Sequence, residues 1–139
     1  MTAVGRTARV ITGNQTELGS VYLDVLQIAA SQSSINLNFV TEPAVGTEHL
    51  LVVKDMNGAD LQINLLGTLE DTHNWISADS YFDLGGSNFV ASISSIPEST
   101  GTNNRITYGS TVTPPGTIIK ILYLGNNLWT ASSSFLSSY

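Results

Sequence analysis

The feature that most constrains this chain is a repeated pattern of short β-prone segments separated by turn residues. The segment Ser34–Phe39 alternates polar and apolar side chains, as expected for a strand with one buried face. Comparable segments are Leu61–Leu65 and Thr117–Leu124, with Gly, Asn and Pro between them. The pattern predicts one all-β domain, an antiparallel β-sandwich or a β-barrel-like fold.

Residues 21–30 are compatible with two kinds of element. Val21, Val25 and Ile28 would share one face of a helix, but the β-branched and aromatic content of the stretch favours a strand. The dense apolar run from Leu50 to Val53 is typical of a strand that is buried on both faces.

Two turns predict β-hairpins. Asn57 and Gly58 tolerate positive φ and are followed at once by the next β-prone segment. Gly125–Asn127 would form the second turn and place Trp129 beside Tyr123 across the hairpin, where an aromatic pair stabilises a sheet.

The two ends of the chain differ from its centre. We expect residues 1–19 to form an extended arm, in which residues 8–12 can pair as a strand, and residues 20–139 to form the β domain. The domain ends in a Ser-rich tail whose apolar side chains would dock on a neighbouring subunit or on the chain's own core. The arm residues with candidate partner contacts are Arg6, Arg9, Val10 and Ile11, and candidates for the subunit interface are Phe135, Leu136 and Tyr139.

Composition excludes several classes of protein. Charged residues make up 12% of the 139 residues, against about 25% in typical proteins. The net charge is −6 and the five cations are scattered, so a nucleic-acid partner is not expected. There is no cysteine, no signal-peptide pattern and no apolar run long enough to cross a membrane. Ser and Thr, about twice as frequent as the charged residues, must solvate the surface.

Few side chains in the sequence suggest catalysis. His49 and His73 lie near carboxylates in the sequence, but a residue one to three positions away rarely orients an imidazole, so both are expected on the surface or at a rim. No Gly-x-Ser-x-Gly nucleophile turn is present. We therefore expect this protein not to be an enzyme and not to bind a cofactor.

One turn raises the question of calcium. Asp55, Asn57 and Asp60 could form a loose calcium site, although their spacing differs from that of an EF-hand. A turn in which the Asp side chains bond their own backbone explains the same residues, so no metal site is expected.

The motifs Val53-Lys54-Asp55-Met56-Asn57-Gly58-Ala59 and Leu122-Tyr123-Leu124-Gly125-Asn126-Asn127-Leu128-Trp129 give the chain a resemblance to small β-rich virion proteins of tailed phages. That group includes capsid decoration (cement) proteins and head- or tail-fibre domains. The chain differs from the fibre pattern in its segment 71–75 and in having no long shaft.

The resemblance implies a non-enzymatic virion protein, made in the host cytoplasm and placed on the capsid surface. Its partners would be the major capsid protein and further copies of itself, as a homotrimer that stabilises the capsid. In this reading the arm residues Arg6, Arg9, Val10 and Ile11 would contact the capsid. The alternative is a tail- or fibre-associated β domain that binds host surface glycans, for which Trp75 is the candidate contact.

Overall fold

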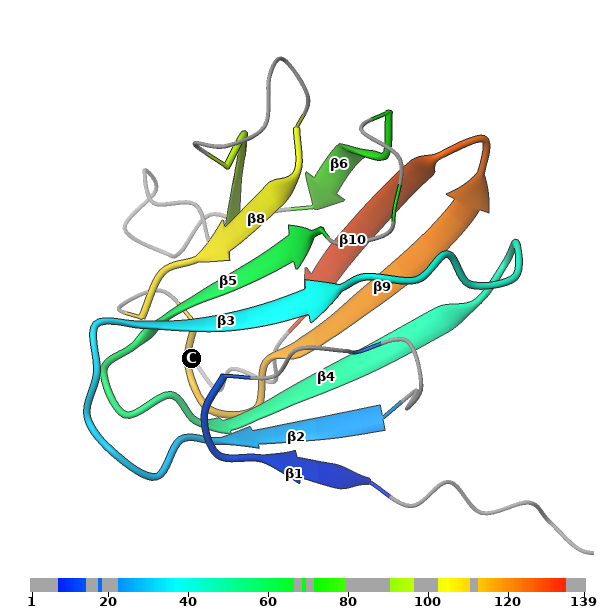
Figure 1. Cartoon of the computed structure of the whole chain (residues 1–139). Helices are drawn as coiled ribbons and strands as arrows, with labels where there is room; N and C mark the ends of the chain where they lie inside the picture. The colour runs from blue at the N-terminus through cyan, green and yellow to red at the C-terminus, as the bar shows by residue number, and fades with distance from the viewer. Residues whose placement is uncertain are drawn as a thin grey trace, which may run out of the picture.

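The computed structural model describes residues 8–14, 18, 23–66, 69, 72–79, 91–96, 103–110 and 113–134 (Figure 1). Within these ranges the chain forms ten strands and no helix, so the all-β prediction is confirmed. The strands are β1 (Arg9–Ile11), β2 (Leu23–Gln27), β3 (Ser34–Phe39), β4 (Glu48–Asp55), β5 (Asp60–Leu65), β6 (Asn74–Asp79), β7 (Ala91–Ser94), β8 (Arg105–Tyr108), β9 (Ile118–Gly125) and β10 (Leu128–Ser134).

The strands form two sheets that lie as two layers (Figure 1). Sheet A has six strands in the order β1-β2-β4-β9-β10-β6, and sheet B has four in the order β3-β5-β8-β7. Both sheets are mixed: β1, β2 and β4 run parallel, as do β3 and β5, whereas β9 is antiparallel to β4 and to β10. The predicted all-β sandwich is present, with parallel as well as antiparallel strand pairs.

The Asn57-Gly58 turn forms but does not close a hairpin. Asn57 has φ 51° and Gly58 has φ 79°, as the turn prediction required. However, the turn joins β4 in sheet A to β5 in sheet B, and these two strands do not pair with each other. β4 pairs with β2 and β9, and β5 pairs with β3 and β8. Strands β2 to β5 therefore alternate between the sheets.

The second predicted hairpin is present. β9 and β10 are antiparallel, Asn126 and Asn127 adopt positive φ at the turn, and Trp129 lies opposite Tyr123. The two rings are 4.8 Å apart between centroids. This hairpin inserts between β4 and β6, so it occupies the middle of sheet A.

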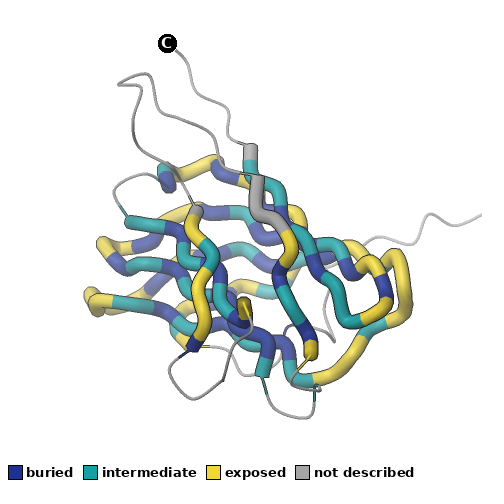
Figure 2. Tube along the Cα trace, turned by 90° about the horizontal axis from the view of Figure 1, so that it is seen from above, coloured by how far each residue is buried: buried dark blue, intermediate teal, exposed yellow. Residues whose placement is uncertain are grey.

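The core lies between the sheets. Buried and more exposed residues alternate along most strands, which Figure 2 shows as a change of colour at nearly every position. In β3 the predicted inward residues Ile35, Leu37 and Phe39 are all buried. Residues 23–27 form a strand, which settles the open choice for that stretch in favour of β structure.

The start of the chain belongs to the sandwich as far as the structure describes it. β1 pairs with β2, Ile11 is buried, and the N–H of the buried Leu18 donates to Asn38 O at 2.9 Å. Most described residues of the expected arm therefore lie within the domain. At the opposite edge of sheet A, the backbone N–H of Trp75 donates to Asn103 O at 2.8 Å. This bond links sheet A to the segment that precedes β8 of sheet B. In the described part of the chain, no helix is long and apolar enough to cross a membrane.

Candidate functional site

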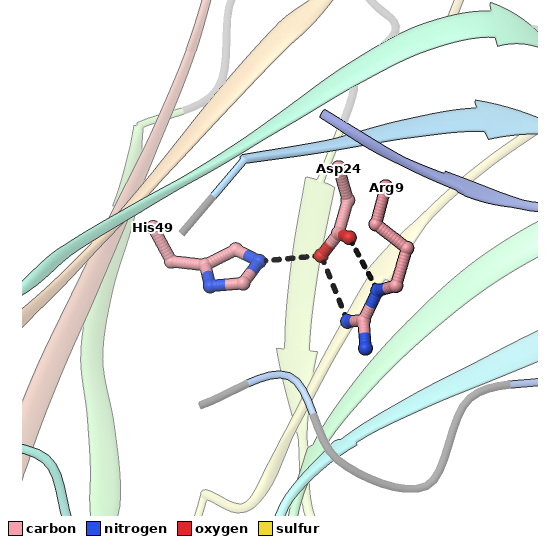
Figure 3. Close-up of polar contacts among 3 residues, drawn as sticks. All are labelled: Arg9, Asp24 and His49. Atoms are coloured by element: carbon pink, nitrogen blue, oxygen red, sulfur yellow. Dashed lines mark hydrogen bonds and ion pairs between the residues drawn. The ribbon is translucent and has the colours of Figure 1, made fainter. Parts of the chain in front are cut away.

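Three polar side chains meet on the inner side of sheet A (Figure 3). Asp24 comes from β2, and its neighbours in the sheet supply Arg9 from β1 and His49 from β4. Arg9 Nε donates to Asp24 Oδ1 at 2.7 Å and Arg9 Nη2 donates to Oδ2 at 3.2 Å. His49 Nε2 lies 2.7 Å from the same Oδ2. One carboxylate thus receives bonds from both adjacent strands.

Burial and hydrogen bonding act on Asp24 in opposite directions. The carboxylate is fully buried, which by itself raises its pKa because the charged form loses water. The hydrogen bonds from His49 and Arg9, with the positive charge of the guanidinium, outweigh this and hold the pKa of Asp24 below its ordinary value. Asp24 is therefore ionised at neutral pH, and His49 Nε2 is the donor in their bond, since a carboxylate only accepts.

A carboxylate that orients an imidazole is a familiar part of a general-base site. Here the imidazole is 3% exposed and the carboxylate 0%. The rings of His49 and Phe39 are also in T-shaped contact, with centroids 5.6 Å apart. This geometry fits a structural role, in which the three side chains link β1, β2 and β4. We call the cluster of Arg9, Asp24 and His49 the internal tie. The prediction of a surface or rim position for His49 was wrong, since the side chain is buried. The prediction considered only carboxylates close in the sequence, whereas the carboxylate that orients His49 lies 25 residues away on a neighbouring strand.

The second histidine is also buried. Trp129 Nε1 donates to His73 Nδ1 at 3.0 Å, and the His73 ring stacks on Tyr123. Tyr123 in turn donates from its hydroxyl to Glu42. The surface prediction for His73 was therefore wrong for a similar reason: its imidazole satisfies the N–H of a buried tryptophan.

Trp75 does not offer a surface for sugar stacking. Its side chain is 1% exposed, its Nε1 donates to Asn104 O at 3.2 Å, and it packs beside Trp129 with ring centroids 5.8 Å apart. A sugar ring needs an open aromatic face. The structure therefore contradicts the choice of Trp75 as a glycan contact.

The other predicted site residues divide into two groups. Arg9 and Ile11 point into the sandwich, whereas Val10 faces outward and is 54% exposed. Arg6 and the tail residues Phe135, Leu136 and Tyr139 lie outside the described residues. Of the expected capsid-contact set that is described, Val10 alone has an exposed side chain.

Asp55 bonds the backbone of its own turn, whereas Asp60 bonds a distant segment of the chain. Asp55 Oδ1 accepts the N–H of Asn57 at 2.8 Å, as the turn prediction requires, and Asp60 Oδ1 accepts the N–H of Ser110 at 2.8 Å. Over the ranges that the structure describes, there is no group of three or more His, Cys, Asp or Glu side chains that could hold a metal ion.

The outer face of sheet B carries a ladder of amides. Asn64 Nδ2 donates to Asn36 Oδ1 at 3.2 Å and to Asn38 Oδ1 at 2.9 Å. Arg105 Nε donates to Asn64 Oδ1 at 2.8 Å. These bonds cross from β3 through β5 to β8, so the amides stiffen the sheet and give its outer surface a polar, mostly uncharged character.

Comparisons with protein-family models, with curated proteins and with solved structures found no match for this chain.

Proposed function

We propose that this chain is a non-enzymatic structural protein of a tailed-phage virion. Specifically, it is a capsid decoration protein that binds the outer capsid surface as a homotrimer and stabilises the shell. The proposal joins the resemblance carried by residues 53–59 and 122–129 to the way in which the chain uses its polar groups.

The observation that carries the structural role is the placement of the ionisable side chains. Among the described residues the buried carboxylate and imidazole side chains are those of Asp24, His49 and His73, and each is bonded to a residue of another strand. This placement supports the proposal, because buried side chains that are held in hydrogen bonds between strands stabilise the fold. The outer surfaces carry mainly amide, hydroxyl and aliphatic groups with few charges, which suit broad, weakly salt-dependent contacts.

The two motifs of the resemblance have structural roles. Residues 53–59 form the end of β4, the turn and the approach to β5, and residues 122–129 contain the β9–β10 turn. They support membership of a class of compact β-rich virion parts. A decoration protein of this kind can bind a shell firmly through many modest contacts, because avidity multiplies them.

The test is co-assembly with the major capsid protein encoded in the same genome. Shells formed with and without the protein would be imaged by electron cryomicroscopy and heated to measure their disruption temperature. The proposal predicts added density on the outer shell surface and a higher disruption temperature. Shells that exclude the protein, or added density only at a tail, would refute it.

A further inference from the structure

The two outer faces of the sandwich differ in chemistry. Whereas the outer face of sheet B carries the amide ladder, the outer face of sheet A carries aliphatic side chains on four neighbouring strands. We name this second surface the aliphatic face; its residues are Val10, Leu23, Val25, Leu50, Val52 and Ile118.

Strand register shows that these side chains are contiguous. Val25 on β2 lies between Val10 on β1 and Val52 on β4, and Val52 is paired in turn with Ile118 on β9. One row of four β-branched residues therefore crosses four strands. Leu23 and Leu50 form a second row beside it.

The aliphatic face points away from the core. Asp24, Leu51 and Ile119, which alternate with it along the strands, are all fully buried between the sheets. On the aliphatic face itself Val10 is 54% exposed and Ile118 is 38% exposed. A contiguous apolar patch on a soluble protein marks a surface that another molecule covers. The apolar run in β4 also predicted burial on both faces, and its outward residues are only half-buried here.

Charges at the border of the patch indicate what covers it. Lys120 is paired with Leu50 across the strands and donates to Glu48 at 3.0 Å, and each of the two side chains is nearly half exposed. The patch thus presents one positive and one negative group side by side. A second copy carries the same pair, so Lys120 of one copy can meet Glu48 of the next with neither charge left alone.

The net charge of the chain restricts where two copies can meet. The whole chain carries a net charge of −6, so two copies repel each other over most of their surface. Association of copies is favoured at a place where the local charges cancel and apolar area is available. The aliphatic face with its Glu48–Lys120 pair meets both conditions.

We infer that the aliphatic face is the surface through which copies of this chain associate. Three copies stand around a common axis with their aliphatic faces toward it, and Lys120 of each copy meets Glu48 of its neighbour. The number three rests on the proposed function; the choice of surface rests on the register, exposure and charges described above.

The test compares matched substitutions on the two outer faces by native mass spectrometry and sedimentation velocity. Val52→Glu places a carboxylate at the centre of the aliphatic face, and Thr107→Glu places the same group at an outward, half-buried position of sheet B. We expect a trimer for the unmodified protein and for Thr107→Glu. For Val52→Glu we expect a folded monomer, with association weakened at least roughly 100-fold, because burying a lone charge opposes assembly.

A charge exchange gives a second test that does not depend on Val52. Lys120→Glu alone should weaken association, because it sets two carboxylates side by side within and between copies. Adding Glu48→Lys restores opposite charges and should restore the trimer. A near-ultraviolet circular dichroism spectrum like that of the unmodified protein confirms that each variant is folded.

Several results would overturn the inference. These are a monomeric unmodified protein at high micromolar concentration, a dimer in place of a trimer, a folded Val52→Glu variant that associates normally, or a charge exchange that fails to restore assembly. Shell binding is scored separately. A trimer that ignores shells refutes the proposed function and leaves the surface standing, whereas a monomer that binds shells refutes the surface and the trimeric part of the proposed function but leaves shell binding standing.

Discussion

At the scale of single residues, the carboxylate of Asp24 joins three strands. It accepts two bonds from Arg9 and one from His49, although it lies in a strand whose other inward residues are apolar. Such a group stabilises the fold only while all of its partners remain, since a buried charge that loses a partner is costly.

Replacement of Asp24 by Asn tests this dependence. The variant keeps the shape but removes the charge that balances the guanidinium of Arg9, so the free energy of unfolding should fall by about 2–4 kcal/mol. Urea titration followed by circular dichroism measures the change. Asp55→Asn is the control: it removes a charge from an exposed turn residue whose new amide oxygen can still accept the N–H of Asn57, so it should cost less than about 0.5 kcal/mol. Equal effects of the two substitutions would contradict the role given to Asp24.

The same carboxylate predicts a pH dependence. The pKa of Asp24 is lowered in the folded protein, so its contribution to stability is complete above the unfolded-state value of about 4 and is lost as the pH falls through the folded-state value. The stability difference between the unmodified protein and Asp24→Asn should therefore shrink as the pH falls below about 4. Urea midpoints above and below this pH measure it, and a difference that grows on acidification would reverse the expected sign.

Replacing glycines by alanine tests whether positive φ values, rather than lack of space for a side chain, determine the effect on stability. Gly58 and Gly125 have φ of 79° and 85°, where a side chain is strained, whereas a Cβ added at Gly13 meets nothing and needs no positive φ. We expect Gly58→Ala and Gly125→Ala each to lower the free energy of unfolding by about 1 kcal/mol and Gly13→Ala to change it little. At Gly125 the new Cβ would also lie 3.0 Å from Val45 Cγ2, but Val45 is exposed and can move. Thermal melts of the three variants provide the comparison.

At the scale of elements, local patterns predicted the strands better than their partners. The alternation in β3 and the Asn-rich turn between β9 and β10 depend on neighbours in the chain, and both predictions were confirmed. The Asn57-Gly58 turn has the residues of a hairpin, yet it connects two sheets. The turn fixes only the local reversal; which strands then pair depends on distant partners, which the turn sequence does not specify.

The internal tie could be recognised in the sequence only in part. His49 was identified, but Asp24 was not, because the two residues are far apart in the chain and meet only through the parallel pairing of β2 with β4. One signal was available: Asp24 takes the place of an apolar residue at an inward position, two residues before Leu26. A charged residue on the buried side of a strand predicts a partner, although not which one.

The length of a tolerated N-terminal deletion follows from β1. Removing residues 1–7 leaves every described contact in place and should change the free energy of unfolding by less than about 0.5 kcal/mol. Removing residues 1–12 deletes β1 with Arg9 and Ile11 and should cost about 3 kcal/mol or more. Urea titration of the two truncated proteins tests this difference. Equal stability of both would show that β1 contributes nothing to the sandwich.

At the scale of the whole molecule, the order of strands predicts slow folding. Strands β2 to β5 each pair with a strand two positions away in the chain, and β4 also pairs with the distant β9. Such non-local pairing loses much chain entropy before it gains contacts, so refolding should take milliseconds to seconds or longer. Stopped-flow fluorescence of the buried Trp75 and Trp129 can follow it. Complete refolding within microseconds would contradict this topology.

Placement of the β9–β10 hairpin at the centre of sheet A bears on how the protein is made. β4 and β6 leave the ribosome well before the strands that will separate them, so each waits with an unsatisfied side. A premature stop ahead of residue 118 would thus remove the middle of sheet A, and a late nonsense mutation should harm this protein as severely as an early one.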